Sequence, residues 1–246
     1  MEPIFKKVYT LSDFETDCNG NLKLSSLLSF VQTVAGEHCI QLCADYDTLL
    51  QRNLFWAVTR HKAEILRLPR RGETVTVETW PMPTSRVAYP RACQAYDAQG
   101  NMLFRSYSIW VLMDITTRKM VLPGKSGVEV AGILRGNELD MPRSLMPLPR
   151  DNSQDRTVTY SCLDRNAHMN NTRYLDWVDD LLSAAFHGEH SPKNFTVCYL
   201  SEATEGQTVS LDWTLGEDNL LQVDGHRQGS SPTDSPVSVF SAQVQF

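Results

Sequence analysis

Residues 17–31 read DCNGNLKLSSLLSFV, and residues 164–178 read DRNAHMNNTRYLDWV. A shift of 147 positions (164 − 17) superimposes Asp17 on Asp164. The same shift matches further positions: Asn19 with Asn166, Leu27 with Tyr174, Leu28 with Leu175 and Val31 with Val178. Each stretch combines a polar turn with an apolar stripe at helical spacing. The sequence therefore predicts a duplicated module.

The first half continues as one helix followed by several strands. Residues 22–43 predict a long helix, because apolar side chains recur on one stripe: Leu24, Leu27, Leu28, Val31, Val34 and Ala35. Alternating apolar and polar runs predict strands at 55–65, 74–80, 91–96 and 103–113, with a hairpin turn at 97–101. This order is typical of an α+β unit in which a sheet curls around its helix.

The second half repeats this plan. It predicts a helix at 170–186 and strands at 157–162, 196–200, 208–215, 220–223 and 237–246. Downstream of the helix the shift changes to 134 (206 − 72), because Gly72 then matches Gly206. This second shift places Leu68 opposite Glu202.

Composition indicates where one module ends and the next begins. Residues 126–153 are rich in Gly, Pro and charge, including Pro142, Pro147 and Pro149, and predict a linker. This linker separates an N-terminal module at 1–125 from a C-terminal module at 154–246. Another turn-rich stretch, residues 225–236, predicts an exposed loop.

The totals limit the classes of function. The 246 residues are 41% apolar, which supports a packed core, and the net charge of −6 provides no general attraction for nucleic acid or an anionic membrane. No apolar run is long enough to span a membrane, and the first residues lack a signal peptide. The six cysteines contain no C-x-x-C pair. A reducing cytoplasm is therefore the expected location.

The differences between the two repeats indicate chemistry. The second half has His168 where the first has Asn21, and Glu202 where the first has Leu68. A histidine changes charge near neutral pH, and a glutamate is a common partner for it in acid–base catalysis. We therefore expect the second module to carry a catalytic site. Asn166 could donate to a developing oxyanion, and Asp164 could orient the imidazole.

Each of these residues also has a structural interpretation. Asp and Asn before a helix are ordinary turn and capping residues, and a glutamate near the end of a strand is usually solvated. His38 and His61 fit structural positions, and His187 with His190 fits a solvated loop better than a metal site. No serine-nucleophile elbow, phosphate loop or zinc-type cysteine cluster is present in the sequence. No metal or cofactor is expected.

Three segments resemble the acyl-acyl carrier protein thioesterases of plants and bacteria. FWAVTRHKAEILRLPRRGETVTVETWP at 55–81 and RSYSIWVLMDITTRKMVLP at 105–123 resemble the family's first-module strands. LDRNAHMNNTRYLDWV at 163–178 is similar to its Asp-x-Asn-x-His-x-Asn-Asn-x-x-Tyr-x-x-Trp signature. The resemblance covers nearly the whole chain.

This resemblance implies a double hotdog fold, α+β, with two tandem modules that each wrap an antiparallel sheet around a long helix. It implies hydrolysis of the thioester between a fatty acyl chain and acyl carrier protein (ACP), with Asp164, Asn166, His168 and Glu202 as catalytic residues. Some members have a cysteine directly after the glutamate, where this chain has Ala203. A thiol mechanism through that position is therefore excluded.

The resemblance also implies that the first module takes the acyl chain along its helix. Four residues are candidates for contacting that chain, and each could equally be core: Leu27, Val31, Val34 and Trp56. Because ACP is acidic, a basic docking surface is expected. The densest positive cluster of the first module supplies its candidates, for which a solvated turn is the alternative: Lys62, Arg67, Arg70 and Arg71.

Other functions fit the same residues. One is a hydrolase of acyl-coenzyme A, a second is a dehydratase, and a third is a non-catalytic acyl-binding protein. Chain-length preference and the choice between ACP and coenzyme A stay open, as does the role of Glu202 as base or nucleophile. A homodimer is also open, because hotdog modules usually pair and this chain already contains two.

Overall fold

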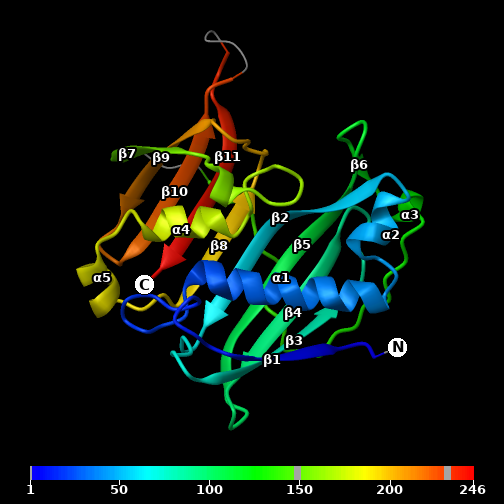
Figure 1. The fold of residues 1–246 in the computed structure, drawn as a ribbon, viewed down its shortest axis with the longest axis horizontal. Helices are drawn as coiled ribbons and strands as arrows, with labels where there is room; N and C mark the ends of the chain where they lie inside the picture. The colour runs from blue at the N-terminus through cyan, green and yellow to red at the C-terminus, as the bar shows by residue number, and fades with distance from the viewer. Residues whose placement is uncertain (1, 147–150, 230–233) are drawn as a thin grey trace. The chain divides into compact units, whose positions relative to one another are not determined.

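The computed structural model describes residues 2–146, 151–229 and 234–246. The chain divides into two compact units, Met1–Pro142 and Arg143–Phe246. Each unit contains one antiparallel sheet with helices on one of its faces (Figure 1). Of the predicted linker, residues 126–142 belong to the first unit, and Pro147 and Pro149 lie outside the described residues.

The first unit combines one long helix with a sheet in the order β1-β3-β4-β5-β2. The helix is α1 (Leu24–Gln41), and all six apolar residues of the predicted stripe are buried on it. The strands are β1 (Phe5–Thr10), β2 (Leu54–Ile65), β3 (Thr74–Pro81), β4 (Tyr89–Tyr96) and β5 (Met102–Asp114), with β6 (Met120–Val121) paired to β5. Two short helices are α2 (Tyr46–Leu50) and α3 (Pro123–Ser126). The predicted helix and strands of this half are confirmed, whereas the sequence did not predict β1.

The second unit has a sheet in the order β8-β11-β10-β9-β7. Its strands are β7 (Asn152–Thr157), β8 (Asn194–Tyr199), β9 (Thr208–Leu215), β10 (Leu220–Arg227) and β11 (Val237–Gln245). The predicted strand at 157–162 is wrong, because β7 ends at Thr157 and a 3₁₀ helix, η1, follows at Tyr160–Cys162. The predicted loop at 225–236 is also partly wrong, because β10 continues to Arg227.

The predicted helix at 170–186 is two short helices, α4 (Arg173–Asp179) and α5 (Ala184–Glu189). Asp179 and Asp180 stand at the C-terminal end of α4, where the helix dipole disfavours negative charge. Ser183 then begins α5, because its side chain accepts a hydrogen bond from the Phe186 N–H. Apolar periodicity across the break predicts one helix, because periodicity alone does not register the capping residue Ser183.

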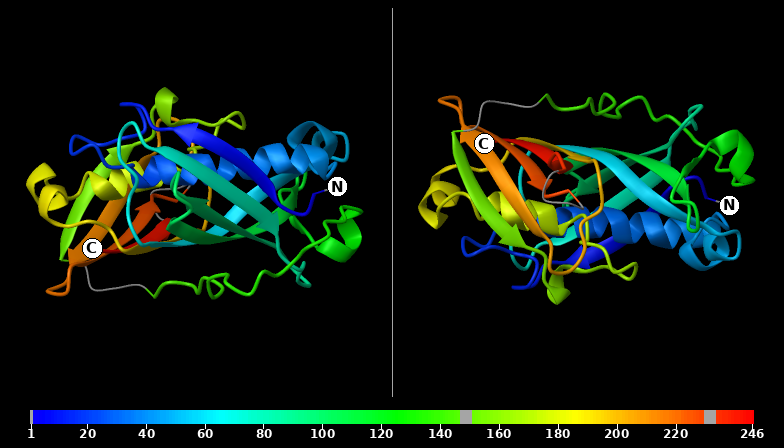
Figure 2. Two further views of the ribbon diagram at one scale, coloured as in Figure 1. Left: turned by 90° about the horizontal axis from the view of Figure 1, so that it is seen from below. Right: turned by 90° about the horizontal axis from the view of Figure 1, so that it is seen from above.

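In the first unit, the sheet is covered on both faces. We call the face toward α1 the inner face and the opposite one the outer face; residues 127–142, the strap, run along the outer face (Figure 2). Apolar side chains of the strap pack on an outer-face cluster around Trp80: Ile133 and Leu139 against Met82, Ala92, Tyr107 and Ile109. The strap therefore closes a second small core that a free linker would leave exposed.

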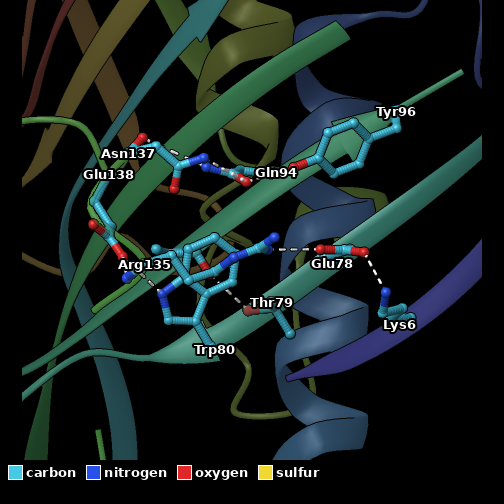
Figure 3. Close-up of polar contacts among 10 residues, drawn as sticks. Lys6, Glu78, Thr79, Trp80, Gln94, Tyr96, Arg135, Asn137 and Glu138 are labelled. Atoms are coloured by element: carbon cyan, nitrogen blue, oxygen red, sulfur yellow. Dashed lines mark hydrogen bonds and ion pairs between the residues drawn. The ribbon is translucent and has the colours of Figure 1, made fainter. Parts of the chain in front are cut away.

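A polar network fastens the strap to β3. Arg135 lies over the Trp80 ring, 4.7 Å from its centroid, and donates to the buried Glu78 at 2.7 Å (Figure 3). Lys6 of β1 reaches the other oxygen of Glu78 at 2.6 Å. Trp80 donates its indole N–H to Glu138 at 3.2 Å. Glu78 is thereby paired with two cations, which offsets the penalty of burying its charge.

Candidate active site

The loop at residues 164–168 is shaped by Asp164. Its Oδ1 accepts hydrogen bonds from the backbone N–H groups of Asn166 (2.8 Å) and His168 (3.2 Å). The Asp164 N–H in turn donates to the carbonyl of His168 at 2.7 Å. Ala167 completes the turn with a φ of 60°, in the left-handed region. Asp164 thus orients His168 through the backbone.

A backbone bridge brings this loop beside Glu202. His168 pairs with Thr204, and the Met169 N–H donates to the carbonyl of Ala203 at 2.8 Å. In consequence His168 Nε2 lies 3.4 Å from Glu202 Oε2. The side chains are 20% and 47% exposed, so a substrate can reach both. The distant pair that the repeat comparison selected is therefore brought together.

The first unit contains the same loop without the acid–base pair. Asp17 Oδ1 accepts from the N–H groups of Asn19 and Asn21, both at 2.9 Å. Asn21 bridges to Arg70, just as His168 bridges to Thr204. The Leu22 N–H donates to the Pro69 carbonyl, as Met169 does to Ala203. The contacts of the two loops thus correspond under the same shifts of 147 and 134 as the sequences. Leu68 occupies the position of Glu202.

Two further residues of the second unit complete the surroundings of the site. Asn166 is exposed on the loop, where its amide is open to solvent. Tyr174 of α4 is 3% exposed and packs on Phe240, with ring centroids 4.6 Å apart. Burial, and then the charges of Glu202 and Asp164, raise the pKa of Tyr174. The sequence indicated Tyr174 only as an apolar-stripe residue, because its neighbourhood to Glu202 depends on the β8–β9 loop.

The residues predicted to contact an acyl chain lie in the first unit. Leu27, Val31 and Val34 are at most 2% exposed on the inner side of α1. Trp56 of β2 is half-buried, and its indole N–H donates to the Ala44 carbonyl at 2.8 Å. All four remain predictions.

Two of the four residues predicted to dock ACP pair with carboxylates of the first unit. Arg67 donates to both oxygens of Glu73, at 2.8 and 2.9 Å, and Arg71 pairs with Asp13. Arg70 is exposed and Lys62 half-buried. Docking therefore stays a prediction, for which Arg70 offers an exposed charge outside these two ion pairs.

Within the described ranges, no group of three His, Cys, Asp or Glu side chains is arranged to hold a metal ion. His187 and His190 instead make hydrogen-bonding contacts with the carbonyls of Asp179 and Phe186. All six cysteines are free thiols. In the same ranges, no helix has both the length and the apolar character to cross a membrane.

The chain therefore combines two sheet-and-helix units, the second of which carries a His–Glu pair beside an Asp-shaped loop. Residues 2–122 match the acyl-ACP thioesterase N-terminal domain, and residues 147–232 match the acyl-ACP thioesterase C-terminal domain. The chain belongs to the acyl-ACP thioesterase family, whose members are acyl-ACP thioester hydrolases.

Curated relatives are distant. The chain is 25% identical over 249 residues to a chloroplastic dodecanoyl-acyl-carrier-protein hydrolase of Cinnamomum camphora, covering 90% of this chain and 64% of the relative. It is 22% identical over 231 residues to a chloroplastic palmitoyl-acyl carrier protein thioesterase of Gossypium hirsutum, covering 88% and 56%. The chain thus spans less than two thirds of the length of these relatives.

Solved structures show the fold. An acyl-ACP thioesterase from Bacteroides thetaiotaomicron has a TM-score of 0.85 at 23% identity, covering 99% of this chain and 97% of the other. A 12:0-ACP thioesterase from Umbellularia californica has a TM-score of 0.82 at 22% identity, covering 100% and 97%. The predicted fold class, an α+β double hotdog, is confirmed.

Proposed function

We propose that this protein hydrolyses the thioester between a fatty acyl chain and ACP, releases the free fatty acid and so ends chain elongation. The observation that carries the proposal is the His168–Glu202 pair, 3.4 Å apart and accessible, in one unit only. The equivalent positions of the other unit are Asn21 and Leu68. Passive binding gives no reason for this asymmetry. The names of the curated relatives support the choice of carrier.

The proposed chemistry uses water as the nucleophile. Glu202, assisted by His168, takes a proton from water as the oxygen adds to the thioester carbonyl carbon. The carbonyl oxygen becomes an oxyanion, toward which the Asn166 side chain donates a hydrogen bond. The intermediate then collapses, the C–S bond breaks, and the carrier's sulfur leaves with the proton. Asp164 keeps His168 and Asn166 in register through its two backbone hydrogen bonds.

The remaining assignments follow from this proposal. The first unit takes the acyl chain along α1, and its Lys62, Arg67, Arg70 and Arg71 face the acidic carrier. Ala203 occupies the position next to Glu202 and is fully buried, so the mechanism needs no thiol there. The free thiols fit a reducing compartment.

The deciding experiment measures fatty acid and free thiol released from acyl-ACP. We expect His168→Asn, which installs the first unit's residue, and Glu202→Gln to reduce kcat by about 10²–10⁴-fold. Glu205→Gln, an exposed carboxylate on the same loop, and Asn21→Ala, at the first-unit equivalent of His168, should stay within about twofold of wild type. Wild-type protein that releases no thiol, or variants as active as the controls, would contradict the proposal.

The same assay separates the alternatives. A hydrolase of acyl-coenzyme A releases thiol from that substrate and little from acyl-ACP. A dehydratase forms an unsaturated acyl-ACP without thiol release. An acyl-binding protein binds ligand with equal affinity before and after Glu202→Gln and turns over neither substrate.

A further inference from the structure

The inner face of the first unit carries buried polar side chains where a packed core would be apolar. His38 of α1 and Arg91 of β4 are 0% and 7% exposed. Three more residues on neighbouring strands share this face and are at most 2% exposed: His61 of β2, and Ser106 and Ser108 of β5. We call these five residues the inner polar group.

Arg91 is the charged member of this group, and its partners are neutral. Its Nη1 donates to His38 Nδ1 at 3.2 Å and to Thr79 Oγ1 at 3.3 Å, and its Nη2 donates to Cys39 Sγ at 3.7 Å. His38 Nε2 lies 3.3 Å from the carbonyl of Glu2, so the ring donates there and accepts from Arg91. Burial lowers the pKa of His38 and raises that of Cys39, which keeps both uncharged.

Arg91 therefore holds an uncompensated positive charge. Throughout the described part of the chain, no carboxylate lies within ion-pair distance of its guanidinium. A guanidinium keeps its proton in proteins, so this charge cannot be shed by deprotonation. A buried charge without a counter-ion destabilises the fold that contains it. Such a residue calls for an explanation beyond packing.

The second unit shows that the fold does not require this polarity. In the strand register, Arg91 lies opposite Pro81 on one side and Ser108 on the other. Leu221 has the equivalent position in the second sheet, opposite Leu215 and Val244. The strand pairings extend the comparison to the other positions: His61 matches Phe195, Ser106 matches Ala242 and Ser108 matches Val244. Leu221 and these three matching residues are apolar and at most 2% exposed. At these matched positions the first unit has polar side chains where the second has hydrocarbon.

The inner polar group lies at one end of an apolar track. Leu27, Val31, Val34 and His38 follow each other at spacings of four, three and four residues, so they share one side of α1. From Leu27 to His38 the helix rises about 16 Å, at 1.5 Å per residue. A ligand that matches this track has a hydrocarbon body and an anionic end.

We propose that Arg91, with the rest of the inner polar group, binds a carboxylate at the far end of the acyl chain. This proposal rests on the proposed function and deepens it: the preferred substrates are thioesters of dicarboxylic acids in which the second carboxylate is free. The guanidinium provides charge and two donors for that carboxylate, and the Ser106 and Ser108 hydroxyls make the same face polar. An acyl chain with a methyl end leaves the charge uncompensated and is disfavoured.

The test compares thioesters of equal length that end in methyl, hydroxyl or carboxylate. We expect wild-type kcat/KM to be at least tenfold higher for the carboxylate end than for the methyl end. Arg91→Leu, which installs the second unit's residue, should abolish or reverse this ratio. Arg105→Leu removes an arginine of the same unit that pairs with Glu64, and should leave the ratio unchanged. A wild-type preference for methyl ends, or an unchanged ratio in Arg91→Leu, would overturn the proposal.

A binding measurement keeps the test independent of catalysis. Free dicarboxylic acid should raise the melting temperature of wild-type protein more than monocarboxylic acid of equal length does, and Ser106→Ala/Ser108→Val should reduce that difference. This double variant serves where Arg91→Leu does not fold. If no thioester is hydrolysed, the proposed function fails, and the melting-temperature comparison still tests carboxylate binding by Arg91. Equal shifts with both acids would refute carboxylate binding.

Discussion

Asp17 and Asp164 fold the same loop in the two units. Each carboxylate accepts, through Oδ1, hydrogen bonds from the N–H groups two and four residues further on, at 2.9 and 2.9 Å in the first unit and 2.8 and 3.2 Å in the second. The fourth residue is Asn21 in one loop and His168 in the other. The same backbone device thus presents an amide once and an imidazole once.

Alanine at these two positions should separate stability from catalysis. Asp17→Ala and Asp164→Ala each remove a side-chain oxygen that accepts two backbone N–H hydrogen bonds, so each should lower the free energy of unfolding by about 1–2 kcal/mol in urea titrations. Only Asp164→Ala should also lower kcat on acyl-ACP, by at least about tenfold, because it releases His168. Equal kcat losses in the two variants would contradict this assignment.

The left-handed residue of each loop provides a second matched pair. Gly20 has a φ of +76° and Ala167 a φ of +60°, and a Cβ on Gly20 would meet nothing within 4 Å. Backbone strain is therefore the main effect of exchange. Gly20→Ala should destabilise the protein by about 1 kcal/mol, and Ala167→Gly should stabilise it by up to about 1 kcal/mol. Chemical denaturation measures both, and effects of the opposite sign would rule out the explanation.

Glu78 should make stability depend on acid. Burial raises the pKa of Glu78, but hydrogen bonds from Lys6 and Arg135 outweigh it and hold the pKa below its ordinary value. Its contribution is therefore present above the unfolded pKa and is lost as the pH falls through the folded pKa. Glu78→Gln should lower the free energy of unfolding by about 1–3 kcal/mol at pH 7. This deficit should shrink toward pH 3, and a deficit independent of pH would contradict the pairing.

His61 should also make stability depend on pH, because it is a base that is buried in its neutral form. Burial lowers the pKa of His61 to about 3, from about 6.5 in the unfolded chain. Between these values the unfolded state binds a proton that the folded state does not, so stability falls as the pH falls below about 6.5. His61→Phe installs the residue of the equivalent Phe195 and should reduce this fall, by up to about 1.4 kcal/mol per pH unit. Identical slopes of unfolding free energy against pH for wild type and His61→Phe, between pH 6.5 and 4.5, would contradict this role of His61.

Docking of ACP is tested by charge reversal on the first unit. Arg70→Glu/Arg71→Glu should raise KM for acyl-ACP by about tenfold or more, since complementary charge steers association. Activity on a small acyl thioester should persist. The effect should weaken as salt is added. Equal losses on both substrates would exclude a docking role.

The sequence predicted elements whose pattern is local and failed where tertiary context decides. The stripe from Leu24 to Ala35 predicts α1, because every side chain on it is buried against one sheet. The sequence does not predict β1, because its alternation over Phe5–Thr10 includes two lysines and leaves every second residue exposed. The sequence predicts a linker where the strap lies, because Ile133 and Leu139 are apolar residues scattered among Gly and charge.

The sequence predicts the candidate site because its two repeats can be compared with each other. The loop pair Asp17 and Asp164 identified His168, and the second shift identified Glu202. The sequence does not identify Arg91, because its match to Leu221 depends on a third shift of 130 (221 − 91) that only the strand pairings reveal. The sequence predicts structural roles for His38 and His61, because helix α1 and strand β2 bring them to the Arg91 side of the sheet only in the folded unit.

The strap also bears on how copies of this chain could assemble. Ile133, Leu139 and Arg135 occupy the outer face of the first sheet around Trp80. A homodimer that buried this face would have to displace the strap, and Glu78 would then lose Arg135, one of its two cations. The strap therefore competes with a second copy of the chain for that face and disfavours self-association through it.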